Sequence, residues 1–226
     1  YPDGRRIFDD ISFSAKPGQI IGITGPVACG KSTLGKVFLC EYPYDGSITW
    51  NGEELQEETA AKRAELIGYL GHDPELFNDT VEQNILMGDQ KDARTYLKAV
   101  CFDEEVEAME QGTEKMPEGI HTLVGNGGVR LSGGQAQRLA LARTLCHKRK
   151  LLILDDPFSA LDKKTEEQIF ANLKEMAKDC VVLLISHRLY LFPQMDQVIW
   201  LNEGQAVIGS HQEVRDQVEE YRRLYD

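Results

Sequence analysis

The chain has 226 residues, of which 42% are hydrophobic and 27% carry a charge, a composition that excludes disordered, collagen-like and coiled-coil proteins. Its net charge of −12 argues against nucleic acid as a partner, because surfaces that bind nucleic acid are basic. No uncharged apolar run approaches the ~18 residues that cross a bilayer. The five cysteines have no paired spacing, which is typical of free thiols in a reducing compartment.

The first third of the chain predicts strands with one helix among them. Residues 11–16 alternate apolar and polar side chains, as a half-buried strand does. Residues 20–24 form a short apolar run, which is typical of a buried parallel strand. The dipeptide Asn51-Gly52 favours a tight turn. We expect a helix over 32–40 and strands over 11–16, 20–24, 47–50 and 66–70.

The pattern becomes helical between residues 74 and 142, where the acid-rich stretch 103–118 indicates a solvated helical face. After residue 142 the aliphatic runs return. They predict strands over 151–154 and 181–185, a helix over 166–177 and a closing hairpin over 198–208. The sequence therefore predicts an α/β core of about 1–73 and 143–226, interrupted by a helical subdomain over about 74–142.

The strongest motif joins the strand at 20–24 to the helix that follows it. Residues 25–32 fit the pattern G-x-x-x-x-G-K-[ST], whose glycines let backbone N–H groups converge on a phosphate. Lys31 is expected to reach the β- and γ-phosphates, and Ser32 to offer its hydroxyl to Mg²⁺. The predicted nucleotide-binding loop comprises Gly25, Pro26, Val27, Ala28, Cys29, Gly30, Lys31, Ser32 and Thr33.

A second motif completes the predicted phosphate and metal site. Four aliphatic residues at 151–154 lead directly into Asp155. A carboxylate at the end of a buried strand beside the phosphate loop can hold Mg²⁺ through its water shell. The pattern is weak alone, because many buried strands end in Asp, but it is strong in combination with the loop.

A third motif, Leu131-Ser132-Gly133-Gly134-Gln135, precedes a helix expected over 136–145. A hydroxyl and two glycine N–H groups at a helix start make a second anion site. One nucleotide does not need two phosphate sites unless each site serves a different subunit. This pentapeptide resembles the signature motif of ATP-binding cassette (ABC) proteins.

The resemblance covers essentially the whole chain. The phosphate loop, the signature, the strand ending in Asp155, the turn at 159–162 and Ser186-His187 stand in the family's order. It implies a P-loop NTPase fold, with a RecA-like core, an antiparallel β region near the N-terminus and an inserted helical subdomain. It also implies that residues 1–226 are a single ABC ATP-binding domain that binds ATP and Mg²⁺ and hydrolyses ATP.

The resemblance further implies roles for single residues. Tyr1 matches the aromatic residue that stacks on adenine, and His187 matches the one that hydrogen-bonds the γ-phosphate. Asp162 would lie at the seam of a head-to-tail dimer with a second ABC ATP-binding domain. In that dimer the partner's bound ATP would be contacted by Ser132, Gly133, Gly134 and Gln135.

The segment 122–127 resembles a loop of ABC exporters. The resemblance implies a transmembrane domain upstream of Tyr1, in keeping with a chain that does not begin with Met. We therefore expect a domain at the cytoplasmic face of the cell membrane that powers transport through ATP-dependent dimerisation. Leu123 and Asn126 replace acidic residues of that loop, so coupling to the membrane domain is expected to differ.

Two catalytic positions depart from the family's pattern. Asp156 stands where the family has the glutamate that polarises the attacking water, and its side chain is one methylene shorter. His72 stands where a glutamine gives an oxygen to Mg²⁺, and neutral imidazole accepts through one nitrogen only. The pair resembles the degenerate-site subunit of a heterodimeric exporter, whereas the intact His187 argues for an ordinary site.

Two other interpretations stay open, namely a homodimeric exporter with ordinary turnover and an ABC ATPase that acts on DNA or ribosomes. The DNA type has long coiled coils between the two motifs, but Lys31 and Ser132 are only 101 positions apart. The ribosome-associated type carries two cassettes in one chain. Three further histidines have no ligand spacing, and we expect them at the surface, namely His121, His147 and His211.

Overall fold

The computed structural model describes residues 4, 6–109, 119–125, 130–158 and 161–225. Tyr1 and the end of the segment 122–127 thus lie outside the described residues. The chain divides into two units, of which the first comprises 1–69, 149–156 and 177–226 and the second 70–148 and 157–176. The predicted subdomain, 74–142, falls within the second unit, which also takes residues 157–176. Its bounds as a functional subdomain stay a prediction.

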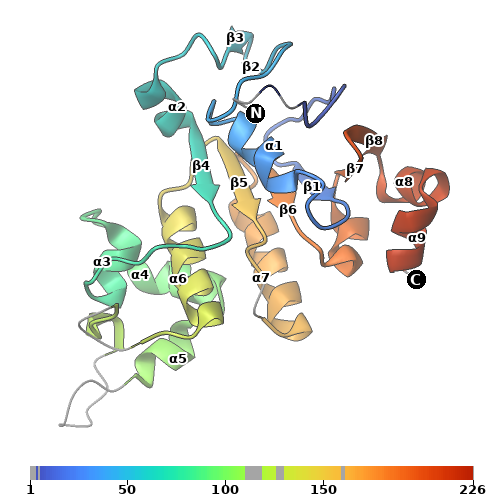
Figure 1. Cartoon of the computed structure of the whole chain (residues 1–226). Helices are drawn as coiled ribbons and strands as arrows, with labels where there is room; N and C mark the ends of the chain where they lie inside the picture. The colour runs from blue at the N-terminus through green and yellow to red at the C-terminus, as the bar shows by residue number, and fades with distance from the viewer. Residues whose placement is uncertain (1–3, 5, 110–118, 126–129, 159–160, 226) are drawn as a thin grey trace. The chain divides into compact units, whose positions relative to one another are not determined.

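The first unit contains a six-stranded sheet in the order β4-β5-β6-β1-β7-β8 (Figure 1). Strands β5, β6, β1 and β7 run parallel, and β8 pairs antiparallel with β7. Every residue of β1, β5 and β6 is buried, which explains why these strands are continuous apolar runs in the sequence. The strands are β1 (Ile20–Thr24), β4 (Ile67–Leu70), β5 (Leu151–Asp155), β6 (Val181–Ile185), β7 (Gln197–Asn202) and β8 (Gln205–Gly209).

Strand β1 is covered on both faces. Ile21 belongs to the core cluster that also contains Leu34 of α1 (Lys31–Val37). Gly22 points the other way, and a Cβ there would lie 2.3 Å from the Met195 sulfur and 2.8 Å from a ring carbon of Phe192. Because successive residues of a strand face opposite sides, α1 covers one face and η2 (Leu189–Gln194) covers the other.

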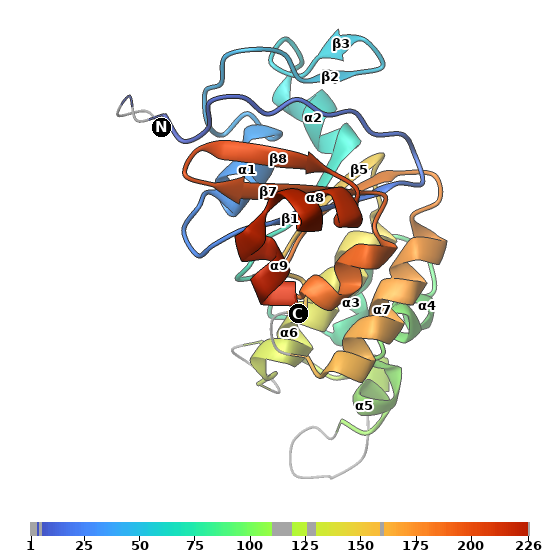
Figure 2. The same ribbon diagram turned by 90° about the vertical axis from the view of Figure 1, so that its right-hand side faces the viewer.

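The predicted C-terminal hairpin is confirmed as β7 and β8. The helices α8 (His211–Gln217) and α9 (Glu219–Tyr225) lie beside it (Figure 2). Tyr221 of α9 is fully buried and packs edge-on against Trp200 of β7, with ring centroids 5.6 Å apart. Its hydroxyl lies 2.7 Å from Nδ1 of His211, so both helices are attached to the hairpin through one aromatic cluster.

The prediction of a strand over 11–16 is wrong, because no strand is formed at these residues. The alternation itself is correct. Ile11, Phe13 and Ala15 pack against the core cluster, and the three polar residues between and after them are exposed. Alternation of apolar and polar residues indicates which side of a segment is buried. A β-strand also needs an adjacent strand with which its backbone forms hydrogen bonds. The antiparallel region consists of β2 (Thr49–Trp50) and β3 (Glu53–Glu54), joined by the predicted Asn51-Gly52 turn.

The second unit is helical, as predicted for 74–142. Helix α6 packs against α3 and α4 and buries Leu139 and Leu141. Within the described residues, no helix is both long enough and apolar enough to cross a membrane. The helices of this unit are α3 (Val81–Leu86), α4 (Ala93–Ala99), α5 (Asp103–Glu107), η1 (Gly119–His121), α6 (Gly133–Cys146) and α7 (Lys163–Met176), while α2 (Ala60–Leu66) belongs to the first unit.

The close approach at Gly22 gives a stability prediction. Gly22→Ala is expected to lower the free energy of unfolding by about 1–3 kcal/mol, because the added methyl overpacks the face covered by Met195 and Phe192. Denaturant unfolding measures this loss, and Met195→Ala in the same background should recover part of it by making room. Gly133→Ala is the control, since a Cβ there meets no atom within 4 Å. An unchanged midpoint for Gly22→Ala would contradict the packing described.

Candidate nucleotide-binding site

The loop between β1 and α1 has a backbone that needs glycine at both ends. Gly25 has a φ of 150°, and a Cβ there would lie 2.0 Å from the carbonyl oxygen of Leu201. Gly30 is the N-cap of α1 with a φ of 101°, which other residues rarely adopt. Ala28 between them also has a positive φ, 64°. The loop therefore curls between a buried strand and a helix, as the motif predicts.

Lys31 is buried in the first turn of α1, with 7% of its surface exposed. Its Nζ donates to the carbonyl oxygens of Gly25 at 3.0 Å and of Pro26 at 2.7 Å. Within the described part of the chain it forms no ion pair with a carboxylate. A buried charge normally has an opposite charge beside it. The loop thus carries a positive charge that an anionic ligand can neutralise.

The parallel sheet brings the predicted catalytic residues of the first unit to one edge. Asp155 ends β5 and pairs in register with Ile185 of β6, which pairs with Ile23 of β1. Asp155 therefore lies level with the end of β1 and two strands away, about 10 Å at the usual strand spacing. Asp156 directly follows β5, and the exposed His187 follows β6 two positions after Ile185. In parallel α/β sheets, ligands bind at this carboxyl edge.

Asp156 has a left-handed backbone conformation, with a φ of 50°. Its N–H donates to the carbonyl oxygen of Ile185 at 2.9 Å. Aspartate enters this region more readily than most other residues with a side chain. The backbone therefore favours aspartate over glutamate at this position, for a reason that is independent of catalysis.

Tyr69 is a site residue that the sequence did not indicate. Its hydroxyl donates to Asp155 Oδ2 at 3.5 Å. Burial and the nearby Asp155 carboxylate raise the pKa of Tyr69, so the hydroxyl keeps its proton and faces the carboxylate as a donor. Tyr69 lies in the apolar run 66–70, where the sequence alone does not distinguish a tyrosine that packs in the core from one that serves a site.

These groups fit a magnesium nucleotide. Lys31 supplies a buried ammonium, and the first turn of α1 supplies N–H groups without a side-chain cap. Ser32 exposes a hydroxyl beside that turn, and Asp155 is a carboxylate with 4% of its surface exposed. Hydroxyl and carboxylate oxygens are the ligands that Mg²⁺ prefers. The donor set therefore suits a phosphate chain with a bound Mg²⁺.

The signature residues lie in the second unit, at the start of α6. Ser132 is the N-cap, and its Oγ accepts from the N–H of Gln135 at 3.3 Å. Gln135 returns the bond, because its Oε1 accepts from the N–H of Ser132 at 2.9 Å. The N–H groups of Gly133 and Gly134 fall in the first turn, where a helix has no internal acceptor for them. The motif therefore begins the helix and also presents donors.

Glu105 supports the signature from a neighbouring helix. Its carboxylate accepts from Gln135 Nε2 at 3.0 Å and pairs with Arg138 Nη1 at 2.7 Å. The guanidinium of Arg138 lies 4.5 Å from the ring centroid of Phe102. The hydrogen bond from Arg138 lowers the pKa of Glu105. The sequence did not reveal this role, because Glu105 stands in an acid-rich stretch that resembles a solvated face.

Asp162 and His72 also belong to the second unit. Asp162 directly precedes α7, where its carboxylate accepts from the N–H of Thr165 at 3.1 Å and from the Thr165 hydroxyl at 2.6 Å. These bonds lower the pKa of Asp162. His72 is exposed between β4 and α3. The predicted roles of both residues, like the role of Tyr1, stay predictions.

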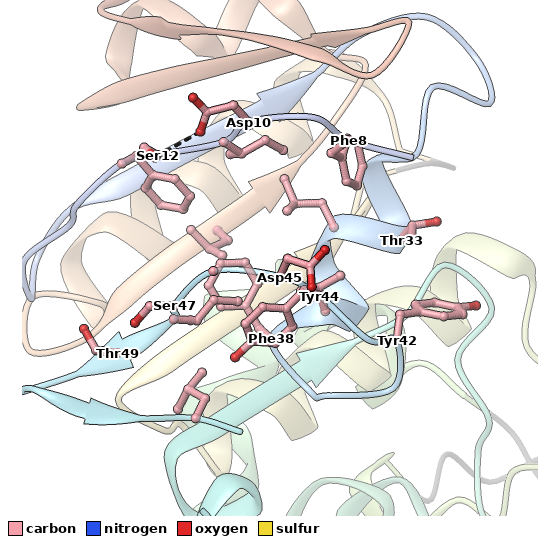
Figure 3. Close-up of a pocket in the computed structure, with 18 of the residues that line it drawn as sticks. Phe8, Asp10, Ser12, Thr33, Phe38, Tyr42, Tyr44, Asp45, Ser47 and Thr49 are labelled. Atoms are coloured by element: carbon pink, nitrogen blue, oxygen red, sulfur yellow. Dashed lines mark hydrogen bonds between the residues drawn. The ribbon is translucent and has the colours of Figure 1, made fainter. Parts of the chain in front are cut away.

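Two hollows of the first unit adjoin the loop. One of about 350 Å³ is lined by residues 26–29 and by the turn at 202–204. The other, of about 800 Å³, lies between the N-terminal segment, α1 and residues 42–50, with Phe8 and Phe38 in its walls (Figure 3). Thr33 lines this second hollow. Arg6 is its only basic residue within the described chain and pairs with Asp9 at 3.3 Å, so this hollow does not suit phosphate.

The sheet, the loop and the carboxylate at its edge define an α/β nucleotide-binding protein of the P-loop class. The family described as "ABC transporter" matches residues 8–159. The chain belongs to that family, as an ATP-binding domain with ATPase chemistry. The α/β P-loop NTPase fold expected from the motifs is thereby confirmed.

Two relatives of similar sequence are named as an ABC transporter protein and as an ATP-dependent flippase. The "Probable multidrug resistance ABC transporter ATP-binding/permease protein YheI" of Bacillus subtilis is 38% identical over 223 residues, which cover 96% of this chain and 37% of that protein. An "ATP-dependent lipid A-core flippase" of Burkholderia pseudomallei is 37% identical over 228 residues, which cover 99% of this chain and 37% of the flippase.

A solved structure shows the same fold. The "Structure of a bacterial Atm1-family ABC exporter with ATP bound" aligns with a TM-score of 0.86 at 30% identity, over 98% of this chain and 39% of that one. The chain thus spans little more than a third of the length of each of these three proteins.

The position of Lys31 predicts how nucleotide affinity depends on it. Lys31→Met is expected to weaken ATP binding about 10- to 150-fold, the equivalent of a charge-assisted contact of about 1.5–3 kcal/mol. Isothermal titration calorimetry measures this loss. Lys36→Met is the matched control on the same helix, because the side chain of Lys36 is 39% exposed and its Nζ lies 3.8 Å from the carboxylate of Glu41. Equal losses in the two variants would contradict the assignment of Lys31.

Proposed function

We propose that this domain powers an ABC exporter by binding and hydrolysing MgATP. The observation that carries the proposal is the buried ammonium of Lys31, which the loop carbonyls hold without an ion-pair partner in the described chain. The exporter relatives and the ATP-bound structural neighbour support the transport role. The domain works at the cytoplasmic face of the membrane, joined to a transmembrane domain and paired with a second ABC domain.

In this proposal the nucleotide is held mainly by residues 25–33. Lys31 neutralises the β- and γ-phosphates, and the backbone N–H groups of the loop donate to them. Tyr1 stacks on the adenine. Ser32, Asp155 and His72 would hold Mg²⁺, which would supply positive charge to balance the charge that develops on the phosphates. Tyr69 positions Asp155 through the hydroxyl hydrogen bond.

Hydrolysis uses the side chains at the carboxyl edge of the sheet. Asp156 orients water toward the γ-phosphorus, and His187 hydrogen-bonds the γ-phosphate. A bond forms between the water oxygen and that phosphorus, while the bond from the phosphorus to the bridging oxygen of ADP breaks. One proton of the water passes to the Asp156 carboxylate and from there to solvent. The carboxylate of Asp156 reaches less far than that of a glutamate, so its water is held less well and turnover is slow.

Dimerisation explains a glycine that the fold of this chain does not require. Gly133 has no positive φ, and a Cβ there would meet nothing within 4 Å. A helix would be more stable with alanine at such a position. In the dimer, the ATP of the partner domain contacts the first turn of α6. Glycine suits this position because a backbone without Cβ lets a phosphate approach its N–H groups closely.

A homodimeric exporter with ordinary turnover is the second candidate. His187 favours it, because this residue keeps its place directly after Ser186 at the carboxyl end of β6. The left-handed backbone at Asp156 favours it too, since that backbone gives a structural reason for aspartate. The two candidates differ in the rate expected of the natural Asp156 site.

Asp156→Glu tests the slow-site proposal. Turnover is expected to rise by up to ~10²-fold with little change in ATP affinity, because only the position of the water improves. The variant should lose less than about 1 kcal/mol of stability through the left-handed backbone. Single-turnover hydrolysis is measured in a context where the dimer forms. The double variant with His72→Gln should exceed the product of the single effects. If Asp156→Glu changes the rate in neither background, the ordinary exporter site is the better description.

Gly133→Ala tests the dimer contact through two effects of opposite sign. The free energy of unfolding should stay the same or rise by up to about 1 kcal/mol, because alanine suits a helix better than glycine. ATP-dependent association, measured by sedimentation, and turnover should both fall at least tenfold, while ATP affinity of the single domain should not change. Association equal to that of the natural chain would show that no ligand approaches this turn.

A further inference from the structure

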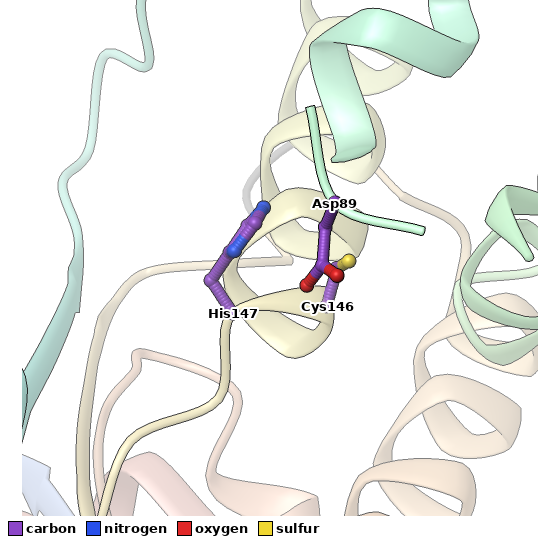
Figure 4. A group of neighbouring side chains, drawn as sticks. All are labelled: Asp89, Cys146 and His147. Atoms are coloured by element: carbon purple, nitrogen blue, oxygen red, sulfur yellow. The ribbon is translucent and has the colours of Figure 1, made fainter. Parts of the chain in front are cut away.

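Three side chains that commonly bind metal ions meet where α6 ends. Asp89, Cys146 and His147 each offer one ligand atom, and these atoms all lie within 4.8 Å of one another. Figure 4 shows the Asp89 carboxylate and the Cys146 sulfur beside the His147 ring. Within the described residues, this is the only such group of three or more. All three belong to the second unit, so the cluster lies within one compact part of the chain.

We propose that Asp89, Cys146 and His147 form a binding site for a thiophilic divalent cation of the Zn²⁺ class, with water as the fourth ligand. Thiolate, imidazole and carboxylate are the three side-chain ligands of protein zinc sites. Alkaline-earth ions are disfavoured, because they prefer oxygen ligands alone. Binding converts the Cys146 thiol to a thiolate and releases its proton to solvent.

One ring nitrogen of His147 already has a hydrogen-bond partner. Its Nε2 lies 3.0 Å from the carbonyl oxygen of Ile85. A carbonyl can only accept, so Nε2 carries the proton and the lone pair lies on Nδ1. Histidines that bind metals commonly donate their second nitrogen to a backbone carbonyl or carboxylate, which fixes the ring. Ile85 of α3 therefore serves as the outer hydrogen-bond partner of this ligand.

The place already attracts a positive charge. Lys91 Nζ lies 2.8 Å from Asp89 Oδ2 and 2.7 Å from the carbonyl oxygen of Cys146. The carbonyl end of the 14-residue helix α6 adds negative potential at this point. The ammonium of Lys91 is thus a built-in competitor, and a metal ion must displace it from Asp89. Removing the Lys91 charge is therefore expected to strengthen metal binding.

The ligand atoms need a small movement to close on a metal. Tetrahedral bonds of about 2.0–2.3 Å place ligand atoms roughly 3.3–3.8 Å apart, compared with up to 4.8 Å in this structure. Cys146 and His147 are fixed at the end of α6, and Cys146 is 2% exposed. Asp89 lies on the connection between α3 and α4, and its side chain is 36% exposed. The Asp89 side chain is therefore the ligand with the most freedom to move toward the other two.

The proposal is tested with Co²⁺ as the probe, on tag-free protein without nucleotide. Cobalt bound to a thiolate gives a charge-transfer absorption that carboxylate sites, including Asp155, do not give. The natural chain is expected to show this absorption with one equivalent of Co²⁺. Asp89→Asn and His147→Gln should each weaken binding at least tenfold. Cys146→Ala should abolish the absorption, whereas Cys180→Ala, which removes another buried cysteine in the first unit, should retain it.

Lys91→Met distinguishes a metal site from a simple ion pair. If the ammonium competes with the metal, this variant should bind Co²⁺ at least threefold more tightly, and Zn²⁺ should raise its melting temperature more than that of the natural chain. Weaker or unchanged binding in Lys91→Met would overturn the proposal. So would a Co²⁺ affinity that is unchanged in Asp89→Asn and His147→Gln, or the absence of the absorption from the natural chain at 100-fold excess of Co²⁺. These outcomes do not depend on the ATPase function proposed above.

Discussion

The burial of β1 between β6 and β7 is the constraint on which the site depends. Helix α1 covers one face of this strand and η2 covers the other, so the position at which β1 ends is fixed. The loop must then turn at Gly25, because the Leu201 carbonyl of the adjacent strand leaves no room for a Cβ. That turn returns the chain to α1 with Lys31 folded onto its own loop carbonyls. The buried charge is thus a consequence of sheet packing, and the affinity for phosphate follows from it.

The glycines of this chain are required for different reasons. Gly22 and Gly25 are required by neighbours within the fold, which a Cβ would strike. Gly133 is not required by the fold, because a Cβ there would project into open space from a helical backbone. A residue that lowers helix stability without a local reason points to a ligand or partner outside the chain. In the proposed dimer, this distinction separates the part of the nucleotide site that one chain would build alone from the part that would need a second domain.

Helix α6 has a different local chemistry at each end. Its start is fixed by the reciprocal bonds of Ser132 and Gln135, with Glu105 and Arg138 behind them. Its end gathers Cys146, His147 and the charges of the α3–α4 connection. A rigid 14-residue helix joins the two. A ligand at the end would therefore hold the connection against the same helix that presents the signature.

The sequence by itself determined the buried strands, the phosphate loop, Asp155 and the signature, because each depends on residue types at fixed short spacing. Tertiary structure decided the rest. Residues 11–16 had the alternation of a strand but found no strand to pair with. Tyr69 and Glu105 gained roles from residues distant in sequence. His147 had no ligand spacing in the sequence, yet in the folded chain it lies beside Asp89. The packing of α3 against α6 brings the two residues together, and spacing along the sequence does not reveal that packing.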